Sequence, residues 1–163
     1  MTTPERAVQA ALFLKKGDNM NNRYKKSTLR AWNLTDQTAA ENENLQFTNS
    51  QRTGCAIRFA DGTGSVTIEK PGIYQIDFNA VASEDGTAGN VIAQLQKNEE
   101  NVKGAFAEAN SAATTAVVNL AFSTIVEIPQ SCACINNTAV LTVENAGVAA
   151  LYTNANIIVT KLC

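Results

Sequence analysis

The residue types that most often perform catalysis are few in this chain and poorly placed for it. Its 163 residues include no histidine, so neither a Ser-His-Asp nor a Cys-His mechanism can operate. Two carboxylate pairs, Glu84–Asp85 and Glu99–Glu100, could in principle do acid–base work, but both fall in segments with turn composition, where a solvated charge is the ordinary role. Gly62 and Gly64 lie in a predicted hairpin turn and lack the strand-to-helix context of a phosphate loop. We therefore predict a protein that is not an enzyme.

Metal binding has little support in the residue spacing. The four cysteines do not show the spacing of a zinc site, and without an export signal we expect reduced thiols that serve as small buried or surface residues. Asp61 and Asp85 could offer loop oxygens to calcium, although neither loop has EF-hand spacing. We predict no cofactor and leave calcium open as the alternative. The cysteines are Cys55, Cys132, Cys134 and Cys163.

Charge divides the chain into two parts. Residues 1–30 hold seven basic and two acidic groups, a net charge of +5, whereas residues 31–163 have a net charge of −7. This asymmetry predicts a basic N-terminal arm, residues 1–30, that docks onto an acidic surface of a neighbouring subunit or another protein. A solubilising tail is the alternative, and nucleic acid is disfavoured because only Tyr24 and Trp32 lie among the basic residues. The basic residues are Arg6, Lys15, Lys16, Arg23, Lys25, Lys26 and Arg30.

The arm also carries the signals that bear on location. Thr3, Pro4 and Glu5 are typical of a helix start, so we predict a short helix over about residues 3–16, with an extended arm as the alternative. The apolar run at residues 10–14 has its basic residues after it rather than before it, so no export signal is predicted. No apolar run approaches the roughly 18 residues of a membrane span. We expect synthesis in the cytoplasm and no membrane partner.

Residues 31–163 show the period of two that a half-buried strand requires. Tyr74, Ile76 and Phe78 alternate with polar residues, and a longer run at 116–128 alternates in the same way. Turn signals recur every 8–12 residues, which indicates an all-β antiparallel jelly-roll sandwich of about ten strands. The predicted strands are 29–34, 45–48, 54–60, a short one from 65, then 73–82, 91–97, 101–109, 116–128, 138–145 and 151–162, with a brief extended piece at 132–135.

The segment Val66–Val81, VTIEKPGIYQIDFNAV, resembles the signature strand pair of the complement and tumour-necrosis-factor jelly-roll superfamily. Three further matches follow in the same order: the hairpin 91–102, the long strand 118–128 and the closing strand 155–162. Two departures stand out, because Glu99 occupies the place of the hairpin glycine and Pro129–Gln130 the place of a Gly-Asp corner. The resemblance covers roughly residues 45–162 and leaves the arm outside.

This resemblance implies a compact homotrimer that works by binding. The expected function is a non-enzymatic structural or interaction protein, a trimeric head attached through residues 1–30 to a larger particle such as a phage virion, as a head fibre or decoration protein. The alternative is a ligand- or carbohydrate-binding surface module, such as a bacterial spore-surface protein. Such a binder should display an exposed aromatic cluster in one set of loops.

Alignment on Gly72, Ile73 and Tyr74 also implies which residues approach the three-fold axis. They are small or carry amides, apart from Asp77, whose three copies would repel one another if they met. Asp77 could hydrogen-bond to a neighbour's amides, bind a cation, line a wet axis, or face solvent away from the axis. We favour the wet, amide-lined axis, because Asn and Gln are the residue types present there and no basic residue is obviously placed to neutralise Asp77. The candidates are Gln75, Asp77, Asn79, Asn119, Ala121, Ser123, Asn154 and Asn156.

Overall fold

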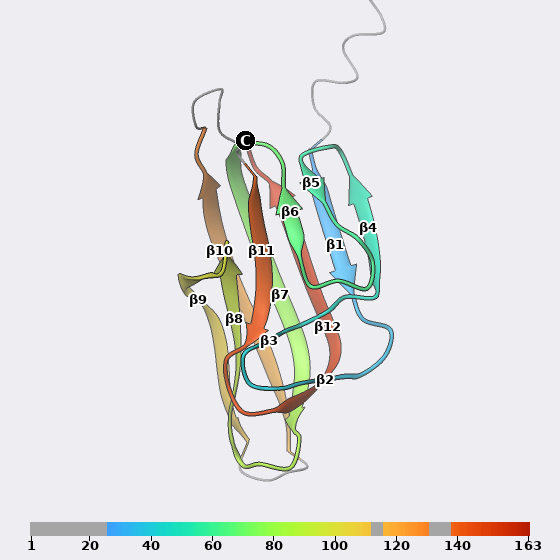
Figure 1. Cartoon of the computed structure of the whole chain (residues 1–163), viewed down its shortest axis with the longest axis vertical. Helices are drawn as coiled ribbons and strands as arrows, with labels where there is room; N and C mark the ends of the chain where they lie inside the picture. The colour runs from blue at the N-terminus through green and yellow to red at the C-terminus, as the bar shows by residue number, and fades with distance from the viewer. Residues whose placement is uncertain (1–25, 112–115, 131–137) are drawn as a thin grey trace, which may run out of the picture.

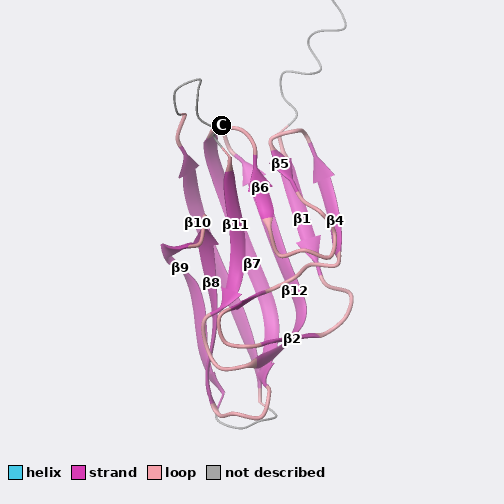
Figure 2. Cartoon of the chain, in the orientation of Figure 1, coloured by secondary structure: helices cyan, strands magenta, loops and turns pink. Residues whose placement is uncertain are grey.

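The computed structural model describes residues 26–111, 116–130 and 138–163, in which twelve strands form two antiparallel sheets packed face to face (Figure 1). Strands and loops account for this whole part of the chain (Figure 2). No helix among the described residues is long and apolar enough to cross a membrane. The helix predicted over residues 3–16 and the extended piece at 132–135 lie outside the described residues.

The first sheet, sheet A, has the strand order β10-β7-β12-β1-β4, with the short β2 paired to β12. All its neighbours are antiparallel, and its long strands correspond to the two alternating runs and the closing strand predicted from the sequence. Its strands are β1 (Thr28–Trp32), β2 (Gln37–Ala39), β4 (Asn49–Thr53), β7 (Gly72–Glu84), β10 (Val117–Ile128) and β12 (Ala150–Lys161).

The second sheet, sheet B, has the order β5-β6-β11-β8-β9, with β3 paired to β11. Together the two main paths contain ten strands, which confirms the predicted jelly-roll sandwich. Both sheets are antiparallel throughout, as that fold class requires. The strands of sheet B are β3 (Glu43–Asn44), β5 (Ile57–Arg58), β6 (Val66–Ile68), β8 (Gly89–Lys97), β9 (Glu100–Ser111) and β11 (Ala139–Asn145).

The hydrophobic core lies between the two sheets and is filled by every second residue of the long strands. Tyr74, Ile76 and Phe78 are buried from β7, and Phe122 of β10 stacks on Phe78 with ring centroids 5.1 Å apart. Each fully buried large apolar side chain contributes roughly 1.5–3 kcal/mol to folding. The same alternation directs the residues between them to the outer face of sheet A.

One polar residue inside the core is fully satisfied. The Asn145 amide nitrogen donates to the carbonyl oxygens of Ala39 (3.0 Å), Ala40 (3.1 Å) and Val148 (2.9 Å), while its amide oxygen accepts from the Tyr152 hydroxyl at 2.9 Å. Asn145 therefore joins β2, β11 and β12 through one side chain. Burial raises the pKa of Tyr152 well above its ordinary value, because the charged phenolate would lose its hydration there.

The short strands at the edge of the sandwich differ from the prediction. Residues 45–48 form no strand, although Phe47 makes an isolated bridge to Thr63. Of the strand predicted over 54–60, the structure keeps only β5, Ile57–Arg58; the preceding strand, β4, ends at Thr53, just before Gly54, which adopts a positive φ of 75°. A Cβ atom at position 54 would lie 2.3 Å from Ser27 Oγ, so two chain segments approach closely here and β4 ends. Sequence periodicity does not encode such a contact between distant segments.

The sandwich also begins before the predicted boundary at residue 31. Arg30 is the central residue of β1, where Leu29 and Ala31 on either side of it are fully buried. β1 pairs with β12 on one side and β4 on the other, so these residues are integral to sheet A. Arg30 is therefore a sheet residue and not part of a detached arm. The predicted strand at 29–34 agrees with this position, whereas the predicted arm, residues 1–30, extended too far.

Candidate assembly face

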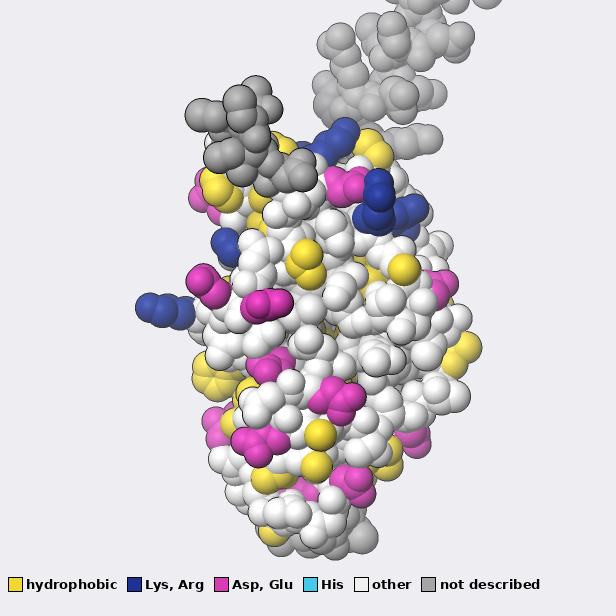
Figure 3. Space-filling view, in the orientation of Figure 1, with side chains coloured by type: hydrophobic (Ala, Val, Ile, Leu, Met, Phe, Trp, Pro, Cys, Tyr) yellow, Lys and Arg dark blue, Asp and Glu magenta, His cyan; other side chains and the backbone are white. Residues whose placement is uncertain are grey.

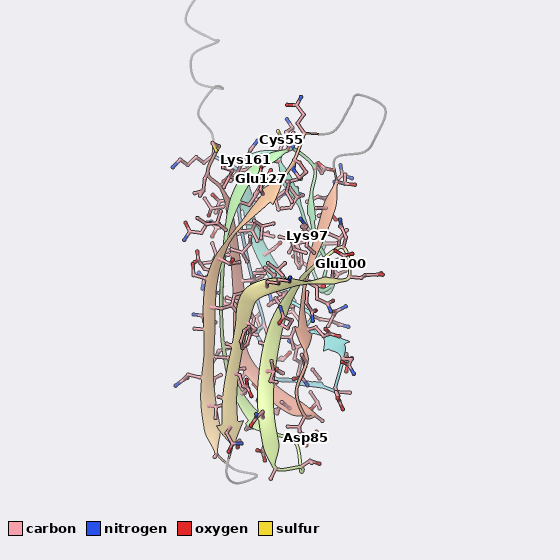
Figure 4. All side chains as sticks on the ribbon, turned by 90° about the vertical axis from the view of Figure 1, so that its left-hand side faces the viewer. Cys55, Asp85, Lys97, Glu100, Glu127 and Lys161 are labelled. Carbon is pink, nitrogen blue, oxygen red and sulfur yellow. The ribbon has the colours of Figure 1, made fainter. Side chains whose placement is uncertain are left out.

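The outward side chains of β1, β12, β7 and β10 form one continuous surface on the side of sheet A away from the core, which we call the A face. Figure 4 shows the two sheets edge-on, so the outer faces of the sandwich lie at its two sides. Strand register arranges the A face in rows that cross all four strands. The three central rows are Thr28–Thr160–Gln75–Ile125, Arg30–Ile158–Asp77–Ser123 and Trp32–Asn156–Asn79–Ala121.

Asp77 is held by neutral donors from its own chain. The Ser123 hydroxyl on β10 donates to Asp77 Oδ1 at 2.6 Å, and the Gln75 amide nitrogen lies 3.2 Å from each carboxylate oxygen. Among the described residues the one ion pair within 4.0 Å joins Arg58 and Glu69, at 2.7 Å on sheet B. The Asp77 charge is therefore oriented by hydrogen bonds but not neutralised within the described part of the chain.

A second network crosses the A face from β1 to β7. Arg30 Nε donates to Asn156 Oδ1 at 3.0 Å, and Asn156 Nδ2 donates in turn to Asn79 Oδ1 at 3.0 Å. The Arg30 guanidinium also lies 5.0 Å from the centre of the Trp32 ring, within the range of a cation–π interaction. These contacts hold the Arg30 side chain flat along the sheet.

The structure brings most of the predicted axis candidates together. Asn119 lies further along the same face, opposite Val81, and Asn154 sits in a bulge at a positive φ of 52°, where the β12 register shifts. Arg30 is the A-face residue that was not among the predicted axis candidates; the strand predicted at 29–34 contained it, but its charge also assigned it to the arm. The candidates that share the central rows are Gln75, Asp77, Asn79, Ala121, Ser123 and Asn156.

The A face combines exposed apolar residues with few charges. Ile125 and Val117 on β10 are 64% and 65% exposed, far more than buried strand residues of the same type. Among the outward residues of its described strands, the charged ones are Arg30, Asp77 and Glu127. By contrast, Asp and Glu side chains are scattered over the outer face of sheet B (Figure 3). The burial patterns of β9 and β11 place Glu108 and Glu144 on that outer face.

The basic residues assigned to the arm and the cysteines do not gather at one site in the described part of the chain. Of the basic residues assigned to the arm, Lys26 is exposed before β1 and Arg30 lies in β1, while the other five are outside the described residues. Cys55 and Cys163 are free and exposed, and Cys132 and Cys134 are outside the described residues. No group of three potential metal ligands occurs in the described part of the chain.

Two expectations about acidic and aromatic side chains can also be compared with the structure. Glu84 does not lie in a solvated turn: it is the last residue of β7, is only 4% exposed, and accepts a hydrogen bond from the Gly89 N–H at 2.9 Å. Glu84 continues the inward-facing row of β7, two residues beyond the end predicted for this strand. In the described loops there is no exposed aromatic cluster; Phe106, 48% exposed, lies within β9.

Comparisons with known proteins identify the fold alone. No family profile and no curated protein sequence matches the chain. Among solved structures, murine APRIL at pH 5.0 aligns over 85% of this chain and 100% of its own, with 11% identity and a TM-score of 0.57. Eiger TNF from S. frugiperda aligns over 86% and 94%, with 11% identity and a TM-score of 0.62.

The PRD1 vertex protein P5 also aligns, over 86% of this chain and 99% of its own, with 15% identity and a TM-score of 0.52. Identities this low establish shared architecture and leave the function to be argued from the surface of this protein. The resemblance predicted from Val66–Val81 is thereby confirmed at the level of fold: the chain forms a tumour-necrosis-factor-like jelly roll.

Proposed function

We propose that this protein is a non-enzymatic structural and interaction protein, a homotrimeric jelly-roll head attached to a larger particle such as a phage virion. The observation that carries the proposal is the A face, a wide sheet surface with exposed apolar residues and few charges. The similarity to a protein named as a vertex protein supports a place on a particle. Its oligomeric state and its attachment are separate parts of the proposal.

The edge of sheet A supports assembly. β10 is a 12-residue strand at the end of sheet A; β9 of sheet B lies close to it without pairing. The outward side chains of Val117 and Ile125 on this strand are exposed, and exposed apolar residues of this size favour contact with another protein surface. Small residues on the same face, Ala121 and Ser123, allow a neighbouring chain to approach closely. A second copy seated there would bury well above the roughly 1,000 Å² expected of a biological interface.

The charge distribution supports attachment through the N-terminal segment. Residues 1–25 contain five basic and two acidic groups, a net charge of +3, while residues 26–163 contain eight basic and thirteen acidic groups, a net charge of −5. The segment is therefore suited to an acidic surface on the particle. Its basic residues are Arg6, Lys15, Lys16, Arg23 and Lys25.

Deleting residues 1–25 tests attachment separately from assembly. Because the described core lies entirely downstream, we expect the truncated protein to keep its melting temperature and its oligomeric mass but to be lost from purified particles. A full-length variant with Lys15 and Lys16 changed to Gln serves as the control for length, and should join the particle less completely than wild type. Full incorporation of the truncated protein would refute the role of this segment, and failure to fold would place it in the core.

A further inference from the structure

We infer that Arg30 of one copy forms an ion pair with Asp77 of the next copy, so that each interface of the trimer contains one such contact. This inference rests on the proposed trimer and identifies which part of the A face meets which part of its neighbour. It replaces the wet axis favoured from the sequence, because that expectation depended on the absence of a nearby basic residue. The structure places one on the same face.

Strand register fixes the spacing of the two charges. Arg30 lies opposite Ile158 on β12, and Ile158 lies opposite Asp77 on β7, so all three share one row. Two strand spacings separate the backbones of Arg30 and Asp77 by about 10 Å. No ion pair joins them in the described chain. The row therefore presents a cation and an anion side by side with an apolar residue between them.

Both side chains are already oriented but still able to accept a partner. Within the described residues, Arg30 hydrogen-bonds through Nε to Asn156, which leaves its two terminal nitrogens for a carboxylate. The Asp77 carboxylate is fixed by Ser123 and Gln75, both neutral donors. A preorganised guanidinium and a preorganised carboxylate lose little freedom when they meet, which favours a specific contact.

The arrangement of the charges fits a ring of copies. In a cyclic assembly each chain offers one part of its surface to one neighbour and a different part to the other. Arg30 lies on the β1 side of the A face and Asp77 on the β10 side, so the two halves are electrostatically complementary. Seating the β10 edge of one copy against β1 and β12 of the next would also cover Ile125 and Ile158. Glu127, the other acidic residue of this face, is the competing acceptor.

A charge exchange tests the pair. The variants are Arg30→Asp, Asp77→Arg and the double exchange, each compared with wild type by light scattering over a dilution series. Each single variant should dissociate at a concentration at least tenfold higher than wild type, because it places like charges at every interface. The double exchange should recover most of that loss, since it restores an opposite pair. Arg58→Asp, a charge reversal on sheet B that also breaks the Arg58–Glu69 ion pair, should still dissociate like wild type.

The outcomes separate this inference from the trimer itself. Two results with a trimeric wild type would show that the Arg30–Asp77 pair is wrong while the trimer stands. One is that the single variants assemble as stably as wild type, and the other is that the double exchange assembles as weakly as the single variants. If the double variant Arg30→Asp with Glu127→Arg recovers assembly instead, the partner of Arg30 is Glu127 and not Asp77. A monomeric wild type would overturn the proposed function as well. If a single variant loses its far-UV circular dichroism, the neutral changes Arg30→Gln and Asp77→Asn replace the charge reversals. Each neutral change alone should weaken assembly, and the two together should weaken it by less than the sum of their separate effects.

Discussion

The Tyr152 hydroxyl donates a 2.9 Å hydrogen bond to the Asn145 amide oxygen at a site where both residues are fully buried. Asn145 completes the network by donating to three backbone carbonyls, so its amide links the β11–β12 turn to the loop after β2. A satisfied polar network of this kind fixes the relative positions of the elements it joins. It also makes the end of the sandwich sensitive to a single substitution.

Changing Asn145 to Leu should destabilise the protein by about 3 kcal/mol, because the buried Tyr152 hydroxyl would lose its acceptor and three backbone carbonyls would each lose one donor. Asn110→Leu, an exposed β9 residue, is the control and should change stability by less than about 1 kcal/mol. Urea unfolding followed by circular dichroism measures both. Equal effects of the two substitutions would show that the buried network contributes little.

Alkaline pH should unfold the protein through its buried tyrosines. Burial raises the pKa of Tyr74 from 10.0 to about 12, and it raises the pKa of Tyr152 further. The folded state therefore retains these protons while the unfolded state releases them, so stability is fully present below pH 10 and falls as the pH rises toward 12. The slope approaches about 1.4 kcal/mol per pH unit for each such tyrosine.

Unfolding by urea at pH values from 8 to 11 measures this dependence. Tyr74→Phe should make the free energy of unfolding fall less steeply above pH 10. The substitution also removes the 2.7 Å hydrogen bond that the Tyr74 hydroxyl donates to the Lys70 carbonyl. Stability that stays constant from pH 9 to 11 in the wild-type protein would contradict the account.

The β8–β9 hairpin should be stabilised by replacing Glu99 with Gly. Asn98 and Glu99 both have positive φ, 53° and 67°, and a side chain at Glu99 costs about 1–2 kcal/mol in this conformation. Glu99→Gly is therefore expected to raise stability by about 1 kcal/mol. This figure is what remains after subtracting the cost of the greater flexibility that glycine gives the unfolded chain. Glu100→Gly, one residue later in β9, should lower stability instead. A lower melting temperature for Glu99→Gly would show that the Glu99 side chain makes a compensating contact.

Two glycines with similar backbone angles should respond differently to alanine. Gly54 and Gly62 have φ values of 75° and 82°, but a Cβ at Gly54 would lie 2.3 Å from Ser27 Oγ, whereas nothing lies within 4 Å at Gly62. Gly62→Ala should cost about 1 kcal/mol for the backbone alone, and Gly54→Ala about 1–3 kcal/mol more for the clash. Thermal melts of the two variants give the comparison. Equal losses would mean that Ser27 moves away freely.

Sequence periodicity predicted the elements whose two faces differ in polarity. The alternation around Tyr74 and Phe122 located β7 and β10, because burial on one face imposes a period of two. Contacts between distant segments were not predictable in this way. The end of β4 depends on Gly54 meeting Ser27, and the large bulge in β9 is stabilised by the Gln94 amide, which donates to the carbonyls of Val102 and Ala105 at 3.1 and 3.2 Å.

The candidate face was predicted in part for the same reason. Gln75, Asp77 and Asn79 were assigned to the outward side of one strand, and the structure confirms that they share it. Arg30 was assigned to the arm, because local charge composition outweighed the short pattern of Leu29 and Ala31. Only strand order shows that β1 and β7 flank β12 and place Arg30 in the row of Asp77.

Light scattering of the full-length protein at micromolar concentration measures assembly through the A face. We expect a mass three times the 17.4 kDa of one chain for wild type, and a shift toward 17.4 kDa for Ile125→Asp. Phe106→Asp, which removes an exposed apolar residue from the outer face of sheet B, should leave the trimer intact. A wild-type mass of 17.4 kDa, or an Ile125→Asp trimer as stable as wild type, would contradict assembly through this face.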